Sequence, residues 1–221
     1  MANHALNPVL AELRERIEQL EGGSQRARQV LPFGVAEVDR ALPGGGLAFG
    51  ALHEVAGGGG GTVDGAAAAL FVAGIAARSR GKVLWCMTRP DLFFPAVAQA
   101  GLHPDRVVFC ESDREEEALS AMEEGLSFGG LAAVVGELVR LPMTASRRLQ
   151  LAAEKTGAMG IVLRRWRRQN EASDYGQPTA STTRWRISTL PSERLPVAGV
   201  GRARWLAELM RVKAGECAEF E

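Results

Sequence analysis

Residues 52–77 read LHEVAGGGGGTVDGAAAALFVAGIAA. The apolar residues around Leu52 and Val55 predict a strand, five consecutive glycines (Gly57–Gly61) follow it, and an alanine-rich run then predicts a helix. Strand, glycine loop and helix in this order are the layout of a phosphate-binding loop, in which backbone N–H groups and the helix N-terminus hold an anion. The stretch therefore predicts an α/β domain organised around such a loop.

The residues after the glycines lack the chemistry of a nucleotide-binding loop. Where the phosphate-loop pattern requires Gly-Lys-Ser/Thr, the chain has Thr62, Val63 and Asp64. We expect Asp64 to place a negative charge where a triphosphate would lie. The stretch is therefore interpreted as a vestigial nucleotide loop, with a glycine-rich surface loop of unrelated origin as the alternative. The residues of this loop are Gly57, Gly58, Gly59, Gly60, Gly61 and Thr62.

Composition and charge limit the class of protein. A chain of 221 residues with 46% hydrophobic and 24% charged residues fits one soluble domain with appendages. Residues 1–139 carry 11 Lys+Arg against 18 Asp+Glu, a balance of −7, and residues 140–221 carry 15 against 8, a balance of +7. This asymmetry predicts that the C-terminal part meets a polyanion or an acidic partner. Three scattered cysteines, no signal peptide and no apolar run long enough for a bilayer predict a cytoplasmic location.

The first 21 residues predict a separate helix, with Asn7 as its cap and Pro8 at its first position. An apolar stripe along this helix could form a short coiled coil or dock on a partner, or it could pack on its own domain. The predicted organisation is an N-terminal helix over 1–21, a linker over 22–30 and one domain over 31–221. The apolar stripe recurs at 4-3-4-3 spacing and consists of Leu6, Leu10, Leu13, Ile17 and Leu20.

Predicted helices and strands alternate along the domain. Alanine- and valine-rich continuous strands indicate a mostly parallel central sheet that is buried on both faces. Residues 184–188 and 204–213 predict antiparallel edge strands at the C-terminus, although 204–213 fits a helix equally well. After the glycine loop, helices are predicted over 65–80, 92–100, 115–125 and 144–156, and strands over 82–87, 106–110, 131–135 and 160–163.

Residues 31–55, LPFGVAEVDRALPGGGLAFGALHEV, carry a resemblance to known proteins. They resemble the segment before the phosphate-binding loop of RecA-type recombinases, where a short helix ends in an LGGGLPxG turn that leads into the first core strand. This resemblance implies a RecA-like P-loop-type core over roughly residues 31–213. The matching residues are Val38–Leu42, Gly44–Leu47, Gly50, Glu54 and Val55.

By the same resemblance, the residues needed for ATP hydrolysis are missing. The metal-organising Asp expected after the strand 131–135 is replaced by Gly136, with Glu137 one position late, and Arg89 stands in place of the catalytic Glu. Phosphoryl transfer needs a phosphate cradle, a metal and a water-orienting group together. We therefore expect no enzyme activity, no catalytic residue, no cofactor and no metal. His53 and His103 have no ligand partners in the sequence and are interpreted as structural.

A basic cluster follows the strand 160–163, and a polar stretch over 171–183 separates it from the next strand. In RecA-like proteins this position holds a loop that binds single-stranded DNA. Arginines supply charge for phosphates, and a tryptophan supplies a flat face for base stacking. We predict that the cluster is the main DNA contact, on a loop that is mobile without DNA. An acidic protein partner is the alternative ligand. The cluster consists of Arg164, Arg165, Trp166, Arg167 and Arg168.

Within the RecA-like superfamily, the chain most resembles the ImuA family of DNA-damage mutagenesis proteins. The resemblance implies a DNA-repair role in the SOS response, in translesion synthesis beside an ImuB-like polymerase-related protein and a DnaE-type error-prone polymerase, with RecA as a further candidate partner. Candidate partner-binding residues are Leu10, Leu13, Ile17, Leu20 and Trp205. The resemblance is carried by Pro32–Gly34, Val38–Asp39, Gly44–Leu47 and the segments 182–188 (TTRWRIS) and 196–204 (PVAGVGRAR).

Two other functions fit the sequence. One is a divergent RecA-type ATPase or recombinase that binds nucleotide through the glycine backbone alone. The other is a protein-only adaptor, such as an inhibitor of cell division, whose arginines meet an acidic protein. A test of ATP binding distinguishes the divergent ATPase from a non-catalytic DNA-binding accessory factor. A test of DNA binding distinguishes that accessory factor from the protein-only adaptor.

Overall fold

The computed structural model describes residues 29–59, 61–166, 171–172 and 175–221, and each predicted element in these ranges lies near its predicted position. The helices are α2 (Ala36–Ala41), α3 (Thr62–Arg78), α4 (Phe94–Gln99), α5 (Glu115–Phe128) and α6 (Met143–Thr156). Two short strands, β1 (Val30–Leu31) and β2 (Leu47–Ala48), pair with each other. The remaining strands are β3 (Leu52–Gly57), β4 (Val83–Met87), β5 (Val107–Glu111), β6 (Ala133–Leu138), β7 (Met159–Arg164), β8 (Thr183–Leu190), β9 (Arg204–Val212) and β10 (Ala218–Phe220).

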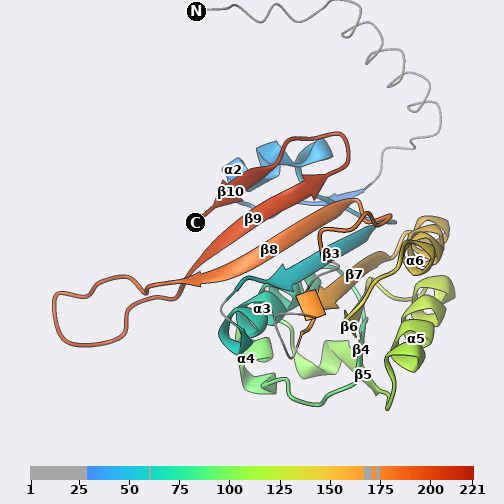
Figure 1. The fold of residues 1–221 in the computed structure, drawn as a ribbon, viewed down its shortest axis with the longest axis horizontal. Coiled ribbons are helices and arrows are strands. Elements are labelled where there is room, and N and C mark those ends of the chain that lie inside the picture. The colour runs from blue at the N-terminus through green and yellow to red at the C-terminus, as the bar shows by residue number, and fades with distance from the viewer. Residues whose placement is uncertain (1–28, 60, 167–170, 173–174) are drawn as a thin grey trace, which may run out of the picture.

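The described strands other than β1 and β2 form one sheet in the order β10-β9-β8-β3-β7-β6-β4-β5 (Figure 1). The six strands from β8 to β5 are parallel, and β9 and β10 extend the β8 edge in antiparallel fashion. The prediction of a mostly parallel α/β sheet with antiparallel C-terminal edge strands is confirmed. Residues 204–212 form a strand, so the helical alternative for this segment is wrong.

Apolar side chains bury the sheet on both faces. On one face the alanine-rich α3 packs closely, because small residues such as Ala68 and Ala76 let its backbone approach Trp85 and Trp185. On the other face α5 and α6 cover a second apolar cluster, which is built around Met122, Leu126 and Leu149. This two-sided burial is what the continuous apolar strands predicted.

Strand boundaries differ from the prediction at two positions that matter for the site. β6 continues to Leu138, so Glu137 lies inside this strand and not after it, and β7 continues to Arg164. The two extensions pair with each other, because Glu137 is opposite Leu163 and Leu138 is opposite Arg164. Polar residues therefore remain in the ladder where the sequence pattern suggested that the strands end.

The predicted N-terminal helix over 1–21 lies outside the described residues, as does most of the predicted linker over 22–30. The last residues of that linker already belong to the domain. Val30 pairs with Ala48, and the Gln29 carbonyl accepts a 2.8 Å hydrogen bond from the backbone N–H of Phe49. None of the helices in the described ranges combines the length and the apolar character needed to cross a membrane.

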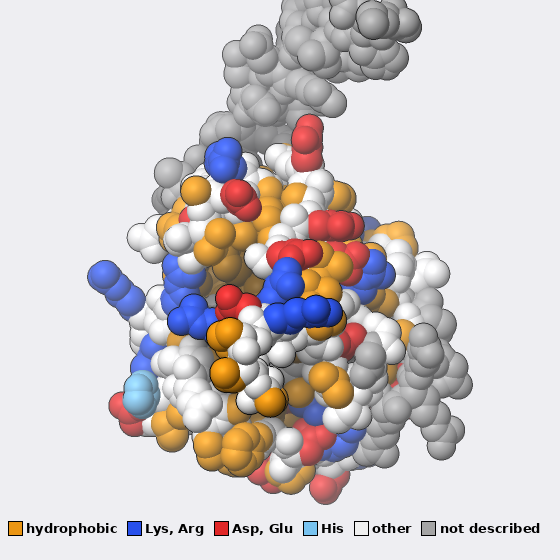
Figure 2. Space-filling view, turned by 90° about the vertical axis from the view of Figure 1, so that its left-hand side faces the viewer, with side chains coloured by type: hydrophobic (Ala, Val, Ile, Leu, Met, Phe, Trp, Pro, Cys, Tyr) orange, Lys and Arg blue, Asp and Glu red, His pale blue; other side chains and the backbone are white. Residues whose placement is uncertain are grey.

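The strands β8 and β9 are joined by a hairpin over residues 191–203 that projects far from the rest of the domain (Figure 1). Three large apolar side chains of this hairpin, Leu195, Val197 and Val200, are exposed. Figure 2 looks at the side of the molecule on which the hairpin projects. Basic side chains form a band across this side, mixed with acidic and apolar ones.

His53 in β3 is a buried structural residue, as its lack of ligand partners predicted. Its Nδ1 lies 2.8 Å from the hydroxyl of Thr183, and its Nε2 lies 2.9 Å from the carbonyl of Ala48. Burial lowers the pKa of this imidazole from its ordinary 6.5 to about 4. The side chain is therefore neutral and joins β3 to its neighbours.

Protonation of His53 is expected to destabilise the fold between pH 6.5 and pH 4. In this window the unfolded chain binds a proton that the folded chain does not, so the free energy of unfolding falls as the pH falls, by about 3 kcal/mol in total. The variant His53→Gln lacks this titration. We expect the difference in unfolding free energy between parent and variant, measured by urea denaturation, to shrink by that amount between neutral pH and pH 4. A difference that is independent of pH would contradict the prediction.

Candidate nucleic-acid interface

The carboxyl ends of β3, β4, β6 and β7 meet at one edge of the sheet, and a cleft of about 740 Å³ lies there. It is lined by the glycine loop and the first turns of α3, by Arg89 and Asp91 after β4, and by the start of α4. Arg164 at the end of β7 and the following Arg165 and Trp166 complete the lining. In open α/β sheets, ligands bind outside the carboxyl ends of the strands. This cleft is therefore the candidate functional site.

The glycine loop and the start of α3 are hydrogen-bonded to β8. The N–H of Gly58 donates a 2.8 Å hydrogen bond to the carbonyl of Ile187. The buried Asp64 accepts hydrogen bonds from the backbone N–H (2.8 Å) and the hydroxyl (2.7 Å) of Thr189. A Cβ at Gly58 would lie 2.1 Å from the hydroxyl oxygen of Ser188, so a side chain here would force Ser188 to move.

This arrangement corrects the prediction for Asp64. Its carboxylate faces β8, where it holds Thr189, and it does not lie at an anion position in the cleft. The described residues of the vestigial loop, Gly57–Gly59 and Gly61–Thr62, do line the cleft, and Gly60 lies outside the described residues. The cationic groups that line the cleft come from the ends of β4 and β7 and not from the loop.

Arg165 is held in the cleft by carboxylates from two neighbouring strand ends. Its Nη2 donates to both carboxylate oxygens of Asp91 at 2.8 Å, and its Nη1 lies 3.4 Å from Oε2 of Glu137. Its side chain is 16% exposed, whereas that of Asp91 is 46% exposed. The Arg165 guanidinium is therefore held in place, and the carboxylate of its partner Asp91 is accessible to solvent.

Glu137 lies beneath Arg165 and is almost fully buried. Its Oε1 accepts a 2.8 Å hydrogen bond from the indole N–H of Trp85. Burial raises the pKa of Glu137, and the nearby Arg165 and the Trp85 hydrogen bond oppose this rise. The carboxylate thus supports Arg165 from below and does not line the cleft. Among the described residues, no group of three or more His, Cys, Asp or Glu side chains is placed to hold a metal ion.

Glu54 is the centre of a buried ionic cluster behind the cleft. One carboxylate oxygen accepts a 2.7 Å hydrogen bond from Arg164. The other accepts hydrogen bonds from Arg184 (2.9 Å) and from the hydroxyl of Thr179 (3.1 Å). Arg164 also donates to the carbonyl of Val139 from Nε (3.1 Å) and Nη2 (2.6 Å). One carboxylate therefore joins the end of β7, the start of β8 and the segment before β8, and Arg164 extends the cluster to Val139.

The prediction that Arg164 lies on a solvated loop is wrong. Arg164 is only 1% exposed because β7 continues through it and turns its side chain toward Glu54. Successive strand residues point to opposite faces, so Arg165 points into the cleft instead. Arg167 and Arg168, two other members of the predicted cluster, lie outside the described residues.

The described part of the stretch 171–183 also packs on the domain, contrary to the prediction of a mobile loop. Tyr175 is buried, its hydroxyl donates to the carbonyl of Trp185, and burial raises the pKa of this phenol. Its ring lies near two guanidinium groups, 5.8 Å from that of Arg164 and 5.3 Å from that of Arg184. Thr179 is buried as well. These contacts are tertiary, so the polar composition of the stretch did not reveal them.

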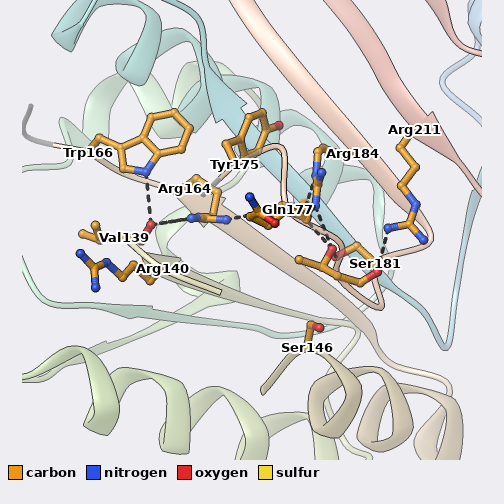
Figure 3. Close-up of polar contacts among 12 residues, drawn as sticks. Val139, Arg140, Ser146, Arg164, Trp166, Tyr175, Gln177, Ser181, Arg184 and Arg211 are labelled. Atoms are coloured by element: carbon orange, nitrogen blue, oxygen red, sulfur yellow. Dashed lines mark hydrogen bonds and ion pairs between the residues drawn. The ribbon is translucent and has the colours of Figure 1, made fainter. Parts of the chain in front are cut away.

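Trp166 stands at the edge of this cluster, with its ring against the cleft (Figure 3). The ring meets Tyr175 edge-on, with centroids 5.2 Å apart and an interplanar angle of 75°. Its indole N–H donates a 3.2 Å hydrogen bond to the carbonyl of Val139, and the Arg164 guanidinium lies 5.6 Å from the ring centroid. The indole is thus held in one orientation, which a stacking platform requires.

Sequence reasoning missed three of the residues that build this site. Asp91 and Arg184 carried no recognisable signal, because their partners lie 74 and 130 residues away along the chain. Tyr175 carried a weak one, since it is the only tyrosine of the chain and stands in an otherwise polar stretch. Glu54 was noted only as part of the resemblance, without its buried partners.

The fold and the site together define a class: α/β proteins with a glycine loop and a polar cleft at the carboxyl edge of a mostly parallel sheet. No family model matches the sequence. The chain is 40% identical over 206 residues to Protein ImuA of Caulobacter vibrioides, from strain NA1000 / CB15N and equally from strain ATCC 19089 / CIP 103742 / CB 15, covering 89% of this chain and 84% of each relative. The chain belongs to the ImuA family.

One solved structure with some similarity to the chain is that of SulA from Pseudomonas aeruginosa. It aligns with a TM-score of 0.44 and 21% sequence identity, over 52% of this chain and 98% of that chain.

Proposed function

We propose that this protein is a non-catalytic accessory factor of damage-induced translesion synthesis that binds single-stranded DNA in the cleft. Membership of the ImuA family supports the role in mutagenesis. The observation that carries the DNA assignment is the pairing of Arg165 with Trp166 on the wall of the cleft. By the same family membership, the proposed partners are an ImuB-like polymerase-related protein and a DnaE-type error-prone polymerase, with RecA as a third candidate.

The chemistry of the cleft suits a single strand. Arg89 and Arg165 offer positive charge for the phosphates, and Trp166 offers an aromatic face for an unpaired base. Arg167 and Arg168 follow directly in the sequence and extend the basic run. The revised contact set is therefore Arg89, Arg165, Trp166, Arg167 and Arg168, without the buried Arg164.

We propose that the core descends from a RecA-like P-loop domain and has lost ATP hydrolysis. Asp64, at the start of α3, is engaged by Thr189, and Glu137 is covered by Arg165. Arg89 stands where the resemblance places the catalytic Glu. The lack of a loop lysine, and the departures at the positions of the metal-organising Asp and the water-orienting Glu, support this loss of hydrolysis.

Replacing Arg165, Arg167 and Arg168 by alanine is expected to flatten the salt dependence of DNA binding. Each arginine that contacts a phosphate contributes roughly 0.7 to the slope of log affinity against log salt on single strands. Three such contacts give a slope difference of about 2, so between about 50 and 200 mM salt the parent should lose roughly 20-fold more affinity than the variant. Fluorescence anisotropy with a labelled oligonucleotide across a salt series measures this difference.

A matched control removes three arginines from another part of the surface. Arg114, Arg147 and Arg148 are exposed on or beside α5 and α6, and their replacement by alanine should leave the salt slope unchanged. If the cleft variant binds DNA like the parent at every salt concentration, the DNA assignment fails and the protein-only adaptor takes its place. Binding that requires ATP would instead favour the divergent ATPase.

A further inference from the structure

A second cavity, of about 390 Å³, lies between α3, the β1–β2 pair and β9. It is an open apolar groove in which Leu31 and Phe33 form one wall, Leu70 and Phe71 of α3 form another, and Trp205 of β9 lies at the side. Phe33, Phe71 and Trp205 are only half-buried, so the groove presents aromatic surface that a further apolar group can cover.

We propose that the leucine stripe of residues 6–20 docks in this groove of the same chain. The chain enters the described domain at Gln29, and the wall of the groove begins two residues later at Leu31. Residues 21–29 alone connect the stripe to that point, and nine residues span at most about 30 Å. The groove is therefore within reach of the stripe.

The short connection also determines whether the groove is occupied by the stripe of the same chain or by that of a second copy. A flexible connection of this length gives an effective concentration in the millimolar range. A second copy at micromolar concentration competes at a disadvantage of roughly a thousandfold. The groove should therefore be filled from within the chain.

The stripe and the groove match in chemistry. Leu10, Leu13, Ile17 and Leu20 have the spacing of the anchors with which an amphipathic helix occupies an apolar groove. Residues 1–21 carry four glutamates and two arginines, a balance of −2. The charged residue that lines the groove is Arg78, which donates to the carbonyls of Pro32 and Phe33 and has no carboxylate partner within the described ranges.

Gly74 in α3 offers a way to fill the groove from inside. A Cβ at this position would meet only the carbonyl of Ala100, at 4.0 Å, and leucine is favoured over glycine within a helix. The variant Gly74→Leu should therefore keep the fold and block the stripe. In the full-length chain, we expect the amides of residues 6–20 to exchange hydrogen at least roughly 10-fold faster in this variant than in the parent.

The exchange experiment has an internal and an external control. Amides of β3 and β8 should exchange at the same rate in parent and Gly74→Leu, which shows that the domain is intact. The control variant Leu151→Ala removes a side chain that is 64% exposed on α6, and it should leave the stripe as protected as in the parent. Equal exchange of residues 6–20 in the parent and Gly74→Leu would overturn the proposal.

Disulfide trapping distinguishes docking within one chain from docking between copies. In a Cys217→Ser background, Gly74→Cys is combined in turn with Leu10→Cys, Leu13→Cys or Ile17→Cys in the full-length chain. Dissolved oxygen with a copper catalyst oxidises two thiols to one disulfide and is itself reduced to water. We expect an intrachain product in at least one combination, and none when Leu151→Cys replaces Gly74→Cys. A covalent dimer as the main product, or no product in any combination, would overturn the proposal.

Discussion

Replacing Glu54 by alanine is expected to lower the free energy of unfolding by about 3–5 kcal/mol, which is a large share of the stability of an ordinary domain. The substitution leaves the guanidinium groups of Arg164 and Arg184 without their carboxylate, and their side chains are only 0% and 7% exposed. Two like charges would then remain in the core without the carboxylate that both contact. Urea denaturation of parent and variant at neutral pH measures the effect.

Two further variants separate the charge from the packing. Glu123→Ala breaks a solvent-accessible ion pair with Arg148 and should cost far less stability than Glu54→Ala. The triple variant Glu54→Leu, Arg164→Met and Arg184→Leu removes all three charges together and should recover much of the stability lost in Glu54→Ala. A loss below about 1 kcal/mol in Glu54→Ala would show that the cluster contributes little to the fold.

Replacing Trp166 by alanine is expected to weaken binding to single-stranded DNA by roughly 1–3 kcal/mol, or about 5- to 150-fold, with no change in the salt slope. The loss arises from base stacking, because the ring lines the cleft and carries no charge. Because the indole also contacts Tyr175 and Val139, the variant Trp166→Phe serves as a matched comparison. It keeps an aromatic face without the N–H, and it should retain most of the affinity.

Trp205 provides the control outside the cleft. It lines the apolar groove and not the cleft, so Trp205→Ala should leave the DNA affinity unchanged. Melting curves recorded for each variant show whether a loss of binding reflects a loss of fold. If Trp166→Ala is as stable as the parent and binds DNA as tightly at every salt concentration, stacking on this residue is disproved.

The succession of elements could be predicted from the sequence because the strands are continuous apolar runs and the helices have clear ends. The strand ends near the cleft could not. Glu137 and Arg164 look like loop residues, and each remains in its strand because a distant group satisfies it, the indole N–H of Trp85 for Glu137 and the carboxylate of Glu54 for Arg164. Tertiary partners of this kind leave no local pattern.

The candidate site was predictable in its charge but not in its geometry. The run from Arg164 to Arg168 indicates a basic surface, yet the alternation of a strand sends Arg164 inward and Arg165 into the cleft. Which of two adjacent arginines points inward depends on where β7 ends, and that depends on its pairing with β6. The anchoring of Asp64 by Thr189 likewise involves residues 125 positions apart.

The carboxylate of Glu54 also constrains how this chain can diverge. Its two arginine partners lie 110 and 130 positions away along the chain, yet all three side chains meet in one buried ionic cluster. Loss of Glu54 alone leaves both arginines buried without the carboxylate that they share, whereas loss of one arginine leaves an intact carboxylate–arginine pair. Glu54 should therefore change only together with both arginines, for example when apolar side chains replace all three. The exposed positions around the cleft are under no such restriction. Residues that contact a ligand can therefore vary among relatives more freely than the buried cluster behind them.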